Sequence, residues 1–285
     1  MSQKALITSR DPQGRHIVDL FGDVLDKAGL TPKEADYLIR RGDKFKAEER
    51  KLLQRLAIGC PASVETAQQL LGTNFFGVEE WQDAYGVTFT KTQLAKVSEF
   101  PWGEATLTAP CPFHPGKKVK DTHFAFLGVE HLDEERKKPL TIRQWQELHP
   151  KSGQPRLYSY PPDCWYEKEG FATTPTCQLR WYLCLKEIVP GSENKTFDEQ
   201  QRMLPVEYEV PSAVEEVTKH VLCFKKTGTC LTPSRYGRVR DVDSHGDRVS
   251  VGCFASRGLI VNNSVDGYPS YDLGLASARK LQLAT

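Results

Sequence analysis

The residues best suited to chemistry in this 285-residue chain are its eight cysteines and seven histidines. Cys111 and His114 stand in a Cys-Pro-Phe-His run and both have zinc-binding side chains, but no second pair follows at the spacing of a zinc finger. No two cysteines form a C-x-x-C pair, so we expect buried or idle thiols. The sequence therefore predicts neither a metal site nor a cofactor.

A catalytic set is also missing from the sequence. An enzyme needs a nucleophile, a base and an orienting group, yet the chain contains no glycine-rich phosphate loop, no G-x-S-x-G and no H-E-x-x-H. We expect five histidines to be surface or packed side chains rather than catalytic ones: His114, His123, His131, His149 and His220. The motifs therefore favour a protein that is not an enzyme.

Charge and hydropathy weigh against two further classes of protein. Lys and Arg total 38 and Asp and Glu total 37, so the formal charge of +1 gives no general attraction for nucleic acid or an anionic membrane. No run approaches the ~18 apolar residues of a membrane span, and the polar start is unlike a secretory signal. We expect a soluble, cytoplasmic protein, and surface display through a partner stays open.

The elements that must position any site fall into two regions, of which residues 1–100 are predicted to be helical. Apolar residues keep helical spacing from Ile17 to Leu25, and Thr31-Pro32-Lys33-Glu34 has the pattern of a helix start. The stretch 40–55 is basic and helical, but its interleaved acids favour a solvated face over a nucleic-acid face. Three further helices are predicted: 64–71 after a Ser63 cap, 78–85 and 90–97.

Residues 101–285 are predicted to form an α+β domain. Helices are expected after three caps, Thr141, Thr196 and Ser212, and the last of these helices has a stripe of three valines for burial. Strands with few helices and no regular alternation favour α+β over a doubly wound sheet. The predicted strands are 123–129, 179–185, 222–225, 249–251, 259–261 and 273–275.

The composition of one stretch is unusual. The chain holds 63 residues of Lys, Glu, Gln, Met and Trp, but none of these five types occurs in the 53 residues from Thr227 to Arg279. Glycine-rich loops and strands disfavour Lys and Glu, which explains a shortage better than an absence. Codons that end in a pyrimidine encode every residue type except these five. The stretch therefore has the alphabet expected if its codons descend from AAC or AAT templates whose adenines were randomised.

The pattern within the stretch indicates a fixed frame and an arbitrary face. Seven apolar residues form the frame, largely at alternate positions: Val249, Val251, Phe254, Leu259, Val261, Leu273 and Leu275. Because neighbouring side chains on a strand point to opposite faces, we expect the interposed residues to face solvent. A binding surface can vary without unfolding the protein if its inner face is constant.

Eleven interposed residues are the predicted ligand-binding positions: Cys253, Ala255, Ser256, Ile260, Asn262, Asn263, Ser264, Gly267, Tyr268, Ser270 and Tyr271. Four more candidates lie earlier in the stretch: Arg238, Arg240, Asp241 and His245. We expect exchanges of Asn262, Asn263, Ser264, Tyr268 or Tyr271 for other polar residues to leave stability within about 0.5 kcal/mol.

The C-terminal motifs Arg248-Val-Ser-Val-Gly252, Gly258-Leu259 and Leu273-Gly-Leu-Ala-Ser-Ala-Arg279 resemble the variable proteins of diversity-generating retroelements. The upstream Arg180-Trp-Tyr-Leu183, Gly191-Ser192 and Val210-Pro-Ser-Ala-Val-Glu215 are similar to the scaffold of such proteins in archaea and small-genome bacteria. The resemblance covers roughly residues 100–285. It implies a C-type lectin fold, related to the formylglycine-generating-enzyme fold, with a variable region at about 227–279.

The resemblance implies selective binding of protein ligands, without catalysis or a cofactor, through a surface that mutagenic reverse transcription rewrites. The calcium motifs of sugar-binding lectins (E-P-N, Q-P-D, W-N-D) do not occur, so calcium-dependent sugar binding is not implied. Three alternatives stay open. They are a non-diversified α+β interaction protein, a nucleic-acid-associated protein, and a formylglycine-generating type of oxidase, for which Cys253 lacks a neighbouring cysteine.

These inferences give one expectation for the fold. We expect residues from about 101 onward to form one compact domain in which the helix after Ser212 packs on a small twisted sheet. Trp181 should be buried, because it lies in an apolar strand between turn-rich segments.

Overall fold

The computed structural model describes residues 15, 31, 33, 61–132, 138–149 and 152–281. The chain divides into two compact units, Met1–Leu56 and Ala57–Thr285. Arg15 and Lys33 lie in helices, and the rest of the helical segments expected before residue 57 lie outside the described residues. The boundary that we expected near residue 100 lies instead near residue 57, because residues between 61 and 100 supply part of the core of the second unit.

The three helices predicted between Ser63 and Val97 are confirmed. They are α4 (Val64–Leu71), α5 (Val78–Tyr85) and α6 (Lys91–Lys96). Ser63 Oγ accepts a hydrogen bond from the Thr66 amide at 3.1 Å, and Thr90 caps α6 in the same way. Trp81 on α5 is fully buried and donates its indole N–H to the Leu127 carbonyl at 2.7 Å, which ties this segment to the sheet behind it.

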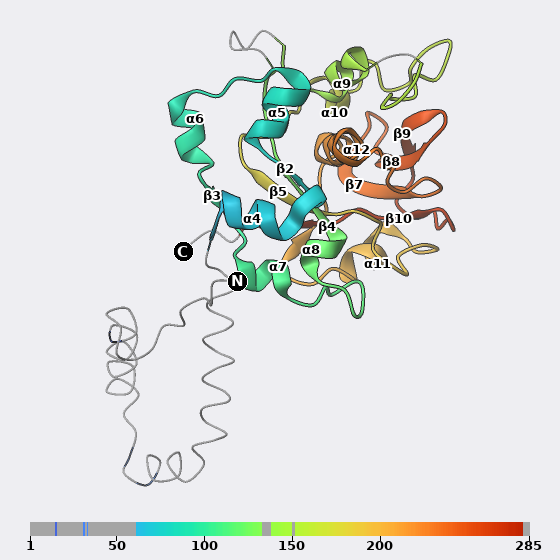
Figure 1. The fold of residues 1–285 in the computed structure, drawn as a ribbon. Helices are drawn as coiled ribbons and strands as arrows, with labels where there is room; N and C mark the ends of the chain where they lie inside the picture. The colour runs from blue at the N-terminus through green and yellow to red at the C-terminus, as the bar shows by residue number, and fades with distance from the viewer. Residues whose placement is uncertain are drawn as a thin grey trace. The chain divides into compact units, whose positions relative to one another are not determined.

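A five-stranded sheet forms one layer of the second unit, in the order β2-β4-β5-β11-β6 (Figure 1). The strands are β2 (Phe75–Phe76), β4 (His123–Leu127), β5 (Trp181–Leu185), β11 (Ala278–Arg279) and β6 (Tyr208–Glu209). β2 pairs with β4 in parallel, and the other neighbours are antiparallel. Every residue of β4 and β5 is buried, so both faces of this sheet are covered. Trp181 is buried as predicted and donates to the Val97 carbonyl at 3.0 Å.

A four-stranded sheet in the order β10-β7-β8-β9 contains most of the compositionally unusual stretch. Its strands are β7 (Tyr236–Val242), β8 (Arg248–Ala255), β9 (Gly258–Ser264) and β10 (Leu273–Leu275). β7, β8 and β9 are antiparallel neighbours, whereas β10 returns beside β7 in parallel. The predicted strands 249–251, 259–261 and 273–275 are therefore confirmed, and β7 was not predicted.

Helix α12 (Ala213–Thr227) contacts β2 and β4 of one sheet and β7 and β8 of the other. Its N-terminus has the predicted capping box, in which the Ser212 side chain accepts from Glu215 N and the Glu215 carboxylate accepts from Ser212 N at 2.7 Å. The predicted stripe of Val214, Val217 and Val221 is buried. The helix lies within the core of the second unit (Figure 1).

Two of our expectations about this region are wrong. Residues 222–225 are the last turns of α12 rather than a strand, because a helix already started at Ser212 adds one bond per residue until Gly228, at φ +71°, ends it. The domain also has two main sheets where we expected one. Glu216 and Lys219 resemble an exposed helix face, but they are buried and bond to each other, so α12 is covered on that side too.

The remaining described elements are short. They are β1 (Ala62–Ser63), η1 (Gly72–Asn74), β3 (Glu99–Phe100), α7 (Glu104–Thr108), α8 (Val119–Thr122), α9 (Ile142–Leu148), α10 (Gly170–Thr173) and α11 (Phe197–Arg202). α9 and α11 begin at the predicted caps Thr141 and Thr196. No helix in the described part of the chain is long and apolar enough to cross a membrane.

Candidate ligand-binding surface

The four-stranded sheet has an inner face toward α12 and an outer face away from it. Phe254 contacts the rings of His220 and Phe224 on α12, and Val251 pairs with Val261 in the same core. All seven frame residues are buried. Leu273 and Leu275, however, pair with Tyr236 and Arg238 on the outer face, where Leu275 belongs to a second, smaller hydrophobic cluster.

The fifteen candidate residues fall into three groups by exposure. The exposed group is Ala255, Ser256, Gly267, Tyr268, Tyr271, Arg240 and His245. The half-buried group is Cys253, Asn262, Asn263, Ser264, Ser270 and Asp241. The buried group is Ile260 and Arg238, which are 4% and 0% exposed. The expectation that interposed side chains face solvent is therefore wrong for the last two residues.

The candidates do not all come together. His245 lies in the turn between β7 and β8, whereas Ala255 and Ser256 lie at the opposite end of β8, in the turn to β9. Residues 265–272, which we call the covering loop, run from the end of β9 across the outer face to the start of β10. Tyr268 and Tyr271 on this loop are 56% and 76% exposed. The exposed candidates therefore lie mainly on the covering loop and the β8–β9 turn rather than on the strands.

Ile260 is buried because another segment runs along β9. Residues 154–160, which we call the strap, pair with the edge of β9 in parallel through the bridge of Leu157 with Leu259. The Leu259 amide donates to the Arg156 carbonyl at 2.8 Å, and the Tyr158 amide donates to the Leu259 carbonyl at 2.8 Å. Since Leu157 shares the inner face with Leu259, Tyr158 lies on the outer face beside Ile260. A sequence pattern within β9 alone cannot reveal this cover.

Arg238 is buried because it fastens the covering loop to the sheet. Its guanidinium donates to the carbonyls of Lys195 at 3.0 Å and Tyr268 at 2.5 Å, and to the Gln200 side-chain oxygen at 3.2 Å. A guanidinium has five N–H donors and suits this divergent set of acceptors. Arg238 is therefore a positioning residue for the loop and not a position that is free to vary.

The covering loop is otherwise held mainly through its own carbonyl groups. Its Asp266 carbonyl accepts from the Phe197 amide at 2.9 Å, and its Ser270 carbonyl accepts from the Asn194 amide at 2.9 Å. Asp272 accepts in the same way from Tyr236 N at 2.7 Å. The Asp266 side chain also forms an ion pair with Arg248 at 2.9 Å. Backbone acceptors remain in place whatever side chain the residue carries.

The β8–β9 turn is held by the strap in the same manner. The Gln154 side-chain amide donates to the Ala255 carbonyl at 2.8 Å, and the Arg156 guanidinium donates to the Ser256 carbonyl at 2.9 Å. Both contacts again end on backbone oxygens. The side chains of Ala255 and Ser256 therefore take no part in fixing the turn.

Asn263 behaves differently from its neighbour Asn262. Asn263 pairs with Val249, and its side-chain amide donates to Asp243 at 2.6 Å. Asp243 also accepts from the amides of His245 and Asp247, so Asn263 supports the β7–β8 turn. Asn262 pairs with Ser250 on the outer face and is half-buried.

Replacing Asn263 by alanine should therefore lower the free energy of unfolding by about 1–2 kcal/mol, because the buried carboxylate of Asp243 loses a hydrogen bond. Asn262→Ala is the matched control and should change it by less than about 0.5 kcal/mol. Urea denaturation of both variants measures the difference. Equal losses would show that Asn263 has no special structural role.

Metal and thiol chemistry find little support among the described residues. In the described segments, no group of three His, Cys, Asp or Glu side chains is placed to hold a metal ion. Cys111 is buried, and the His114 ring lies 4.0 Å from Glu187. Burial raises the pKa of the Cys177 thiol to about 12, which keeps it protonated and unreactive near neutral pH.

The histidines in the core resemble packed residues, as predicted for them. Burial lowers the pKa of His123 to about 3 and that of His149 to about 4, so both are neutral at physiological pH. His123 bonds to the hydroxyls of Thr122 and Tyr208 at 2.9 and 3.1 Å. These contacts show that His123 is a packed, hydrogen-bonded core residue.

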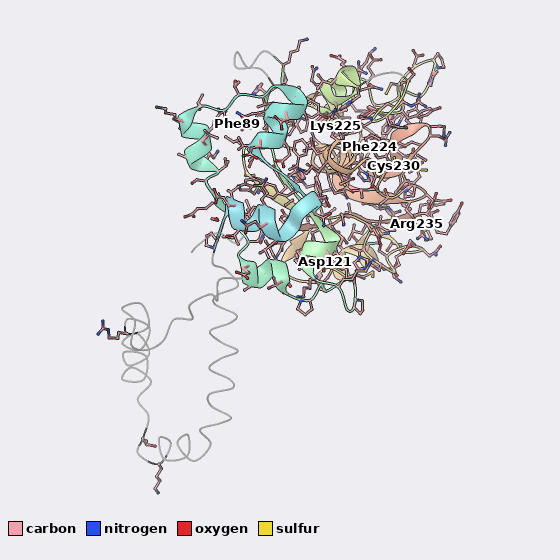
Figure 2. All side chains as sticks on the ribbon, viewed as in Figure 1. Phe89, Asp121, Phe224, Lys225, Cys230 and Arg235 are labelled. Carbon is pink, nitrogen blue, oxygen red and sulfur yellow. The ribbon has the colours of Figure 1, made fainter. Side chains whose placement is uncertain are left out.

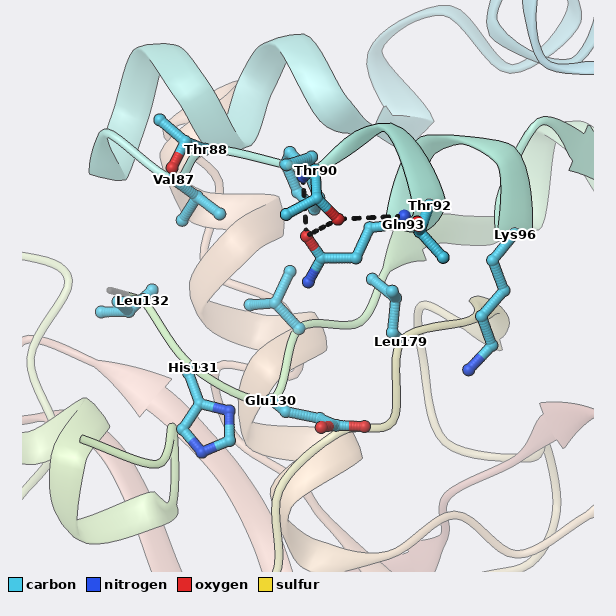
Figure 3. A pocket seen from close by; sticks show the side chains of 12 residues that line it. Val87, Thr88, Thr90, Thr92, Gln93, Lys96, Glu130, His131, Leu132 and Leu179 are labelled. Atoms are coloured by element: carbon cyan, nitrogen blue, oxygen red, sulfur yellow. Dashed lines mark hydrogen bonds between the residues drawn. The ribbon is translucent and has the colours of Figure 1, made fainter. Parts of the chain in front are cut away.

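Among the grooves formed by the described residues of the second unit, two are relevant here. The first, of about 620 Å³, lies between residues 87–96 and 129–132, with Glu130 and His131 on one side and Gln93 and Lys96 on another (Figure 3). None of the fifteen candidate residues lines it. The second groove, of about 730 Å³, is lined in part by residues 227–235, which belong to the compositionally unusual stretch.

Sequence reasoning missed the strap and the second groove. The aromatic cluster of Tyr158, Tyr160, Trp165 and Tyr166 was the available signal for the strap, since the Tyr160 hydroxyl and the Trp165 indole both donate to the Val261 carbonyl. No motif marks the second groove, because its walls come from distant segments. Comparison of the chain with protein-family models, curated proteins and solved structures found no match.

Proposed function

We propose that this protein binds protein ligands through a surface whose side chains are diversified while its backbone stays fixed. The surface consists of the covering loop and the β8–β9 turn, with Ala255, Ser256, Gly267, Tyr268 and Tyr271 as its exposed positions. The protein would act by binding and not by catalysis. In this proposal the second unit is a C-type-lectin-like domain of the kind found in variable proteins of diversity-generating retroelements.

The observation that carries the proposal is the way the surface is held. The strap, Arg238, Phe197 and Asn194 all bond to backbone oxygens of the surface segments and not to their side chains. The scaffold therefore makes the same bonds after substitution at the exposed positions. A surface that must accept many side chains requires this independence.

The residue types at the surface suit protein recognition. Tyr268 and Tyr271 supply large amphipathic rings at low entropic cost, and serine, asparagine and glycine give adaptable hydrogen bonds. Antibody paratopes favour the same types. The C-terminal motifs that resemble retroelement proteins fall on β8, on the start of β9 and on β10–β11, and β8, β9 and β10 are the strands that these surface segments join.

A display library tests the proposal. Codons with free first and second bases and a pyrimidine third base would be placed at five exposed positions: Ala255, Ser256, Gly267, Tyr268 and Tyr271. Most clones should stay folded, judged by protease resistance on the cell surface, and selection on unrelated protein targets should yield distinct binders. The scaffold bonds described above are the physical reason.

A control library tests whether the protein would stay folded after substitution at any position. It applies the same codons to five buried frame positions: Val249, Val251, Phe254, Leu259 and Val261. Most of these clones should lose protease resistance, because the core would contain cavities and polar groups. Equal loss of folding in both libraries, or an absence of binders from the first, would contradict the proposed function.

A further inference from the structure

The second groove lies between the end of α12 and the segment that follows β5. Its walls include Ile188, Leu231 and Pro233, and Lys186 and Cys223 also line it. Cys230 and Arg235, labelled in Figure 2, line it from the compositionally unusual stretch. Its volume of about 730 Å³ is enough to admit a side chain or a short loop of another molecule.

Lys186 is a charged group of this groove for which the described segments hold no ion-pair partner. Its ammonium is half-buried and donates to Asn74 Oδ1 at 3.0 Å, which is a neutral acceptor. Asn74 Nδ2 donates to the Lys120 carbonyl at 2.9 Å, so the orientation of the amide is fixed with its oxygen toward Lys186. Within the described segments, no carboxylate lies at salt-bridge distance from Lys186. An ammonium has three donors, so two remain for a ligand.

The groove is also lined by Arg235 and by two carboxylates, Glu187 and Glu193. Arg235 forms an ion pair with Glu193, and Glu187 is mostly exposed and lies 4.0 Å from the ring of His114. Burial lowers the pKa of Lys186, which means that the fold holds this charge at a cost in free energy. A bound anion would remove that cost. Apolar walls beside one ammonium suit an organic carboxylate better than a strongly hydrated phosphate.

The groove is continuous with the proposed binding surface. The Arg235 carbonyl accepts from the Cys253 amide at 2.7 Å, so the rim of the groove joins the end of β8. On the other side Asn194, next to Glu193 of the groove, donates its amide to the Ser270 carbonyl of the covering loop. A ligand seated on Tyr271 and the β8–β9 turn would therefore reach the groove.

We propose that this groove is an anchoring pocket for a carboxylate, carried by an acidic side chain of the protein ligand, with Lys186 as its cation. Lys186 lies outside the stretch from Thr227 to Arg279, so the pocket would combine a fixed cation with variable walls. The inference that the carboxylate belongs to a protein ligand rests on the proposed function. The presence of the pocket does not.

Amide-shift titration of the full-length, nitrogen-15-labelled protein tests the pocket. The probe is N-acetyl-glutamic acid α-amide, which carries one carboxylate, and the matched control probe is the neutral N-acetyl-glutamine α-amide. The acid should give saturable shifts at residues 186–193 and 229–235, and the neutral probe should bind at least about tenfold more weakly, because it lacks a charge-assisted bond. Equal binding of the two probes, or no shifts at these residues, would overturn the proposal.

Two variants and one further ligand sharpen the test. Lys186→Met keeps the apolar stem and should abolish the shifts, whereas Lys186→Arg should retain them. Inorganic phosphate should not compete with the acid, and effective competition would overturn the assignment to a carboxylate. If Lys186→Met fails to fold, the comparison of the two probes on the unaltered protein decides alone. Because these probes need no diversification, their failure leaves the library test of the proposed function untouched.

Discussion

Replacing Arg238 by methionine is expected to lower the free energy of unfolding by about 3 kcal/mol or more. The guanidinium is fully buried and donates to the carbonyls of Lys195 and Tyr268 and to the side chain of Gln200. Methionine fills much of the same volume but donates nothing. Each buried acceptor left without a partner costs about 1–3 kcal/mol, and at least two acceptors would be left.

The control for this substitution is Arg257→Met. Arg257 is exposed, and its guanidinium lies 5.4 Å from the centre of the Tyr158 ring. Its replacement should change stability by no more than about 0.5 kcal/mol. Denaturation in guanidinium chloride measures the free energy of unfolding of both variants. In limited proteolysis, the Arg238→Met variant should be cut first within the covering loop. Similar, small losses in the two variants would show that Arg238 does not fasten the loop.

The second large effect is expected at the buried frame. Truncating Val251, Leu259 or Leu275 to alanine should cost roughly 2–4 kcal/mol each, because every one of these side chains is fully buried and would leave a cavity. Leu259 and Val251 face α12, whereas Leu275 lies in the smaller cluster on the outer face. Truncation should therefore lower the free energy of unfolding whether the side chain lies on the inner or the outer face of the sheet.

Exposed positions on the same segments provide the contrast. Tyr268→Ser, Tyr271→Ser and Ala255→Ser should each stay within about 0.5 kcal/mol, since these side chains are exposed. Chemical denaturation of the two sets decides the question. Comparable destabilisation by both sets would mean that the covering loop is ordinary core, and the proposal of a variable surface would fail.

Local elements were predictable because their signals are local. Ser63, Thr90, Thr141, Thr196 and Ser212 each cap a helix where the sequence places it, since capping needs only residues within one turn. The burial of the frame was likewise visible, because strand alternation separates Val249 and Val251 from the residues between them. The expectation of one inner face is wrong for Leu273 and Leu275, which pair with residues on the outer face.

Long-range arrangement was less predictable, for two physical reasons. The charges of Glu216 and Lys219 resemble a solvated face, and their mutual bond in the core cannot be read from spacing alone. The pairing of the strap with β9 joins segments about 100 residues apart, so no local pattern indicates that Ile260 is covered. The burial of Arg238 could not be predicted for the same reason, because the acceptors of its hydrogen bonds lie in distant segments, among them α11 and the covering loop.

Sequencing the gene and its surroundings tests the central claim most directly. Ala255, Ser256 and Gly267 should be encoded by codons that end in a pyrimidine, whereas Tyr268 and Tyr271 are not informative because every tyrosine codon ends in one. A near-copy of the stretch from Thr227 to Arg279, with adenines where the two copies differ, should lie close to a reverse transcriptase gene. The same codon rule should hold at Ser264 and Ser270. Purine third bases at most of these positions, or a locus without such a copy, would contradict the claim that this surface is diversified.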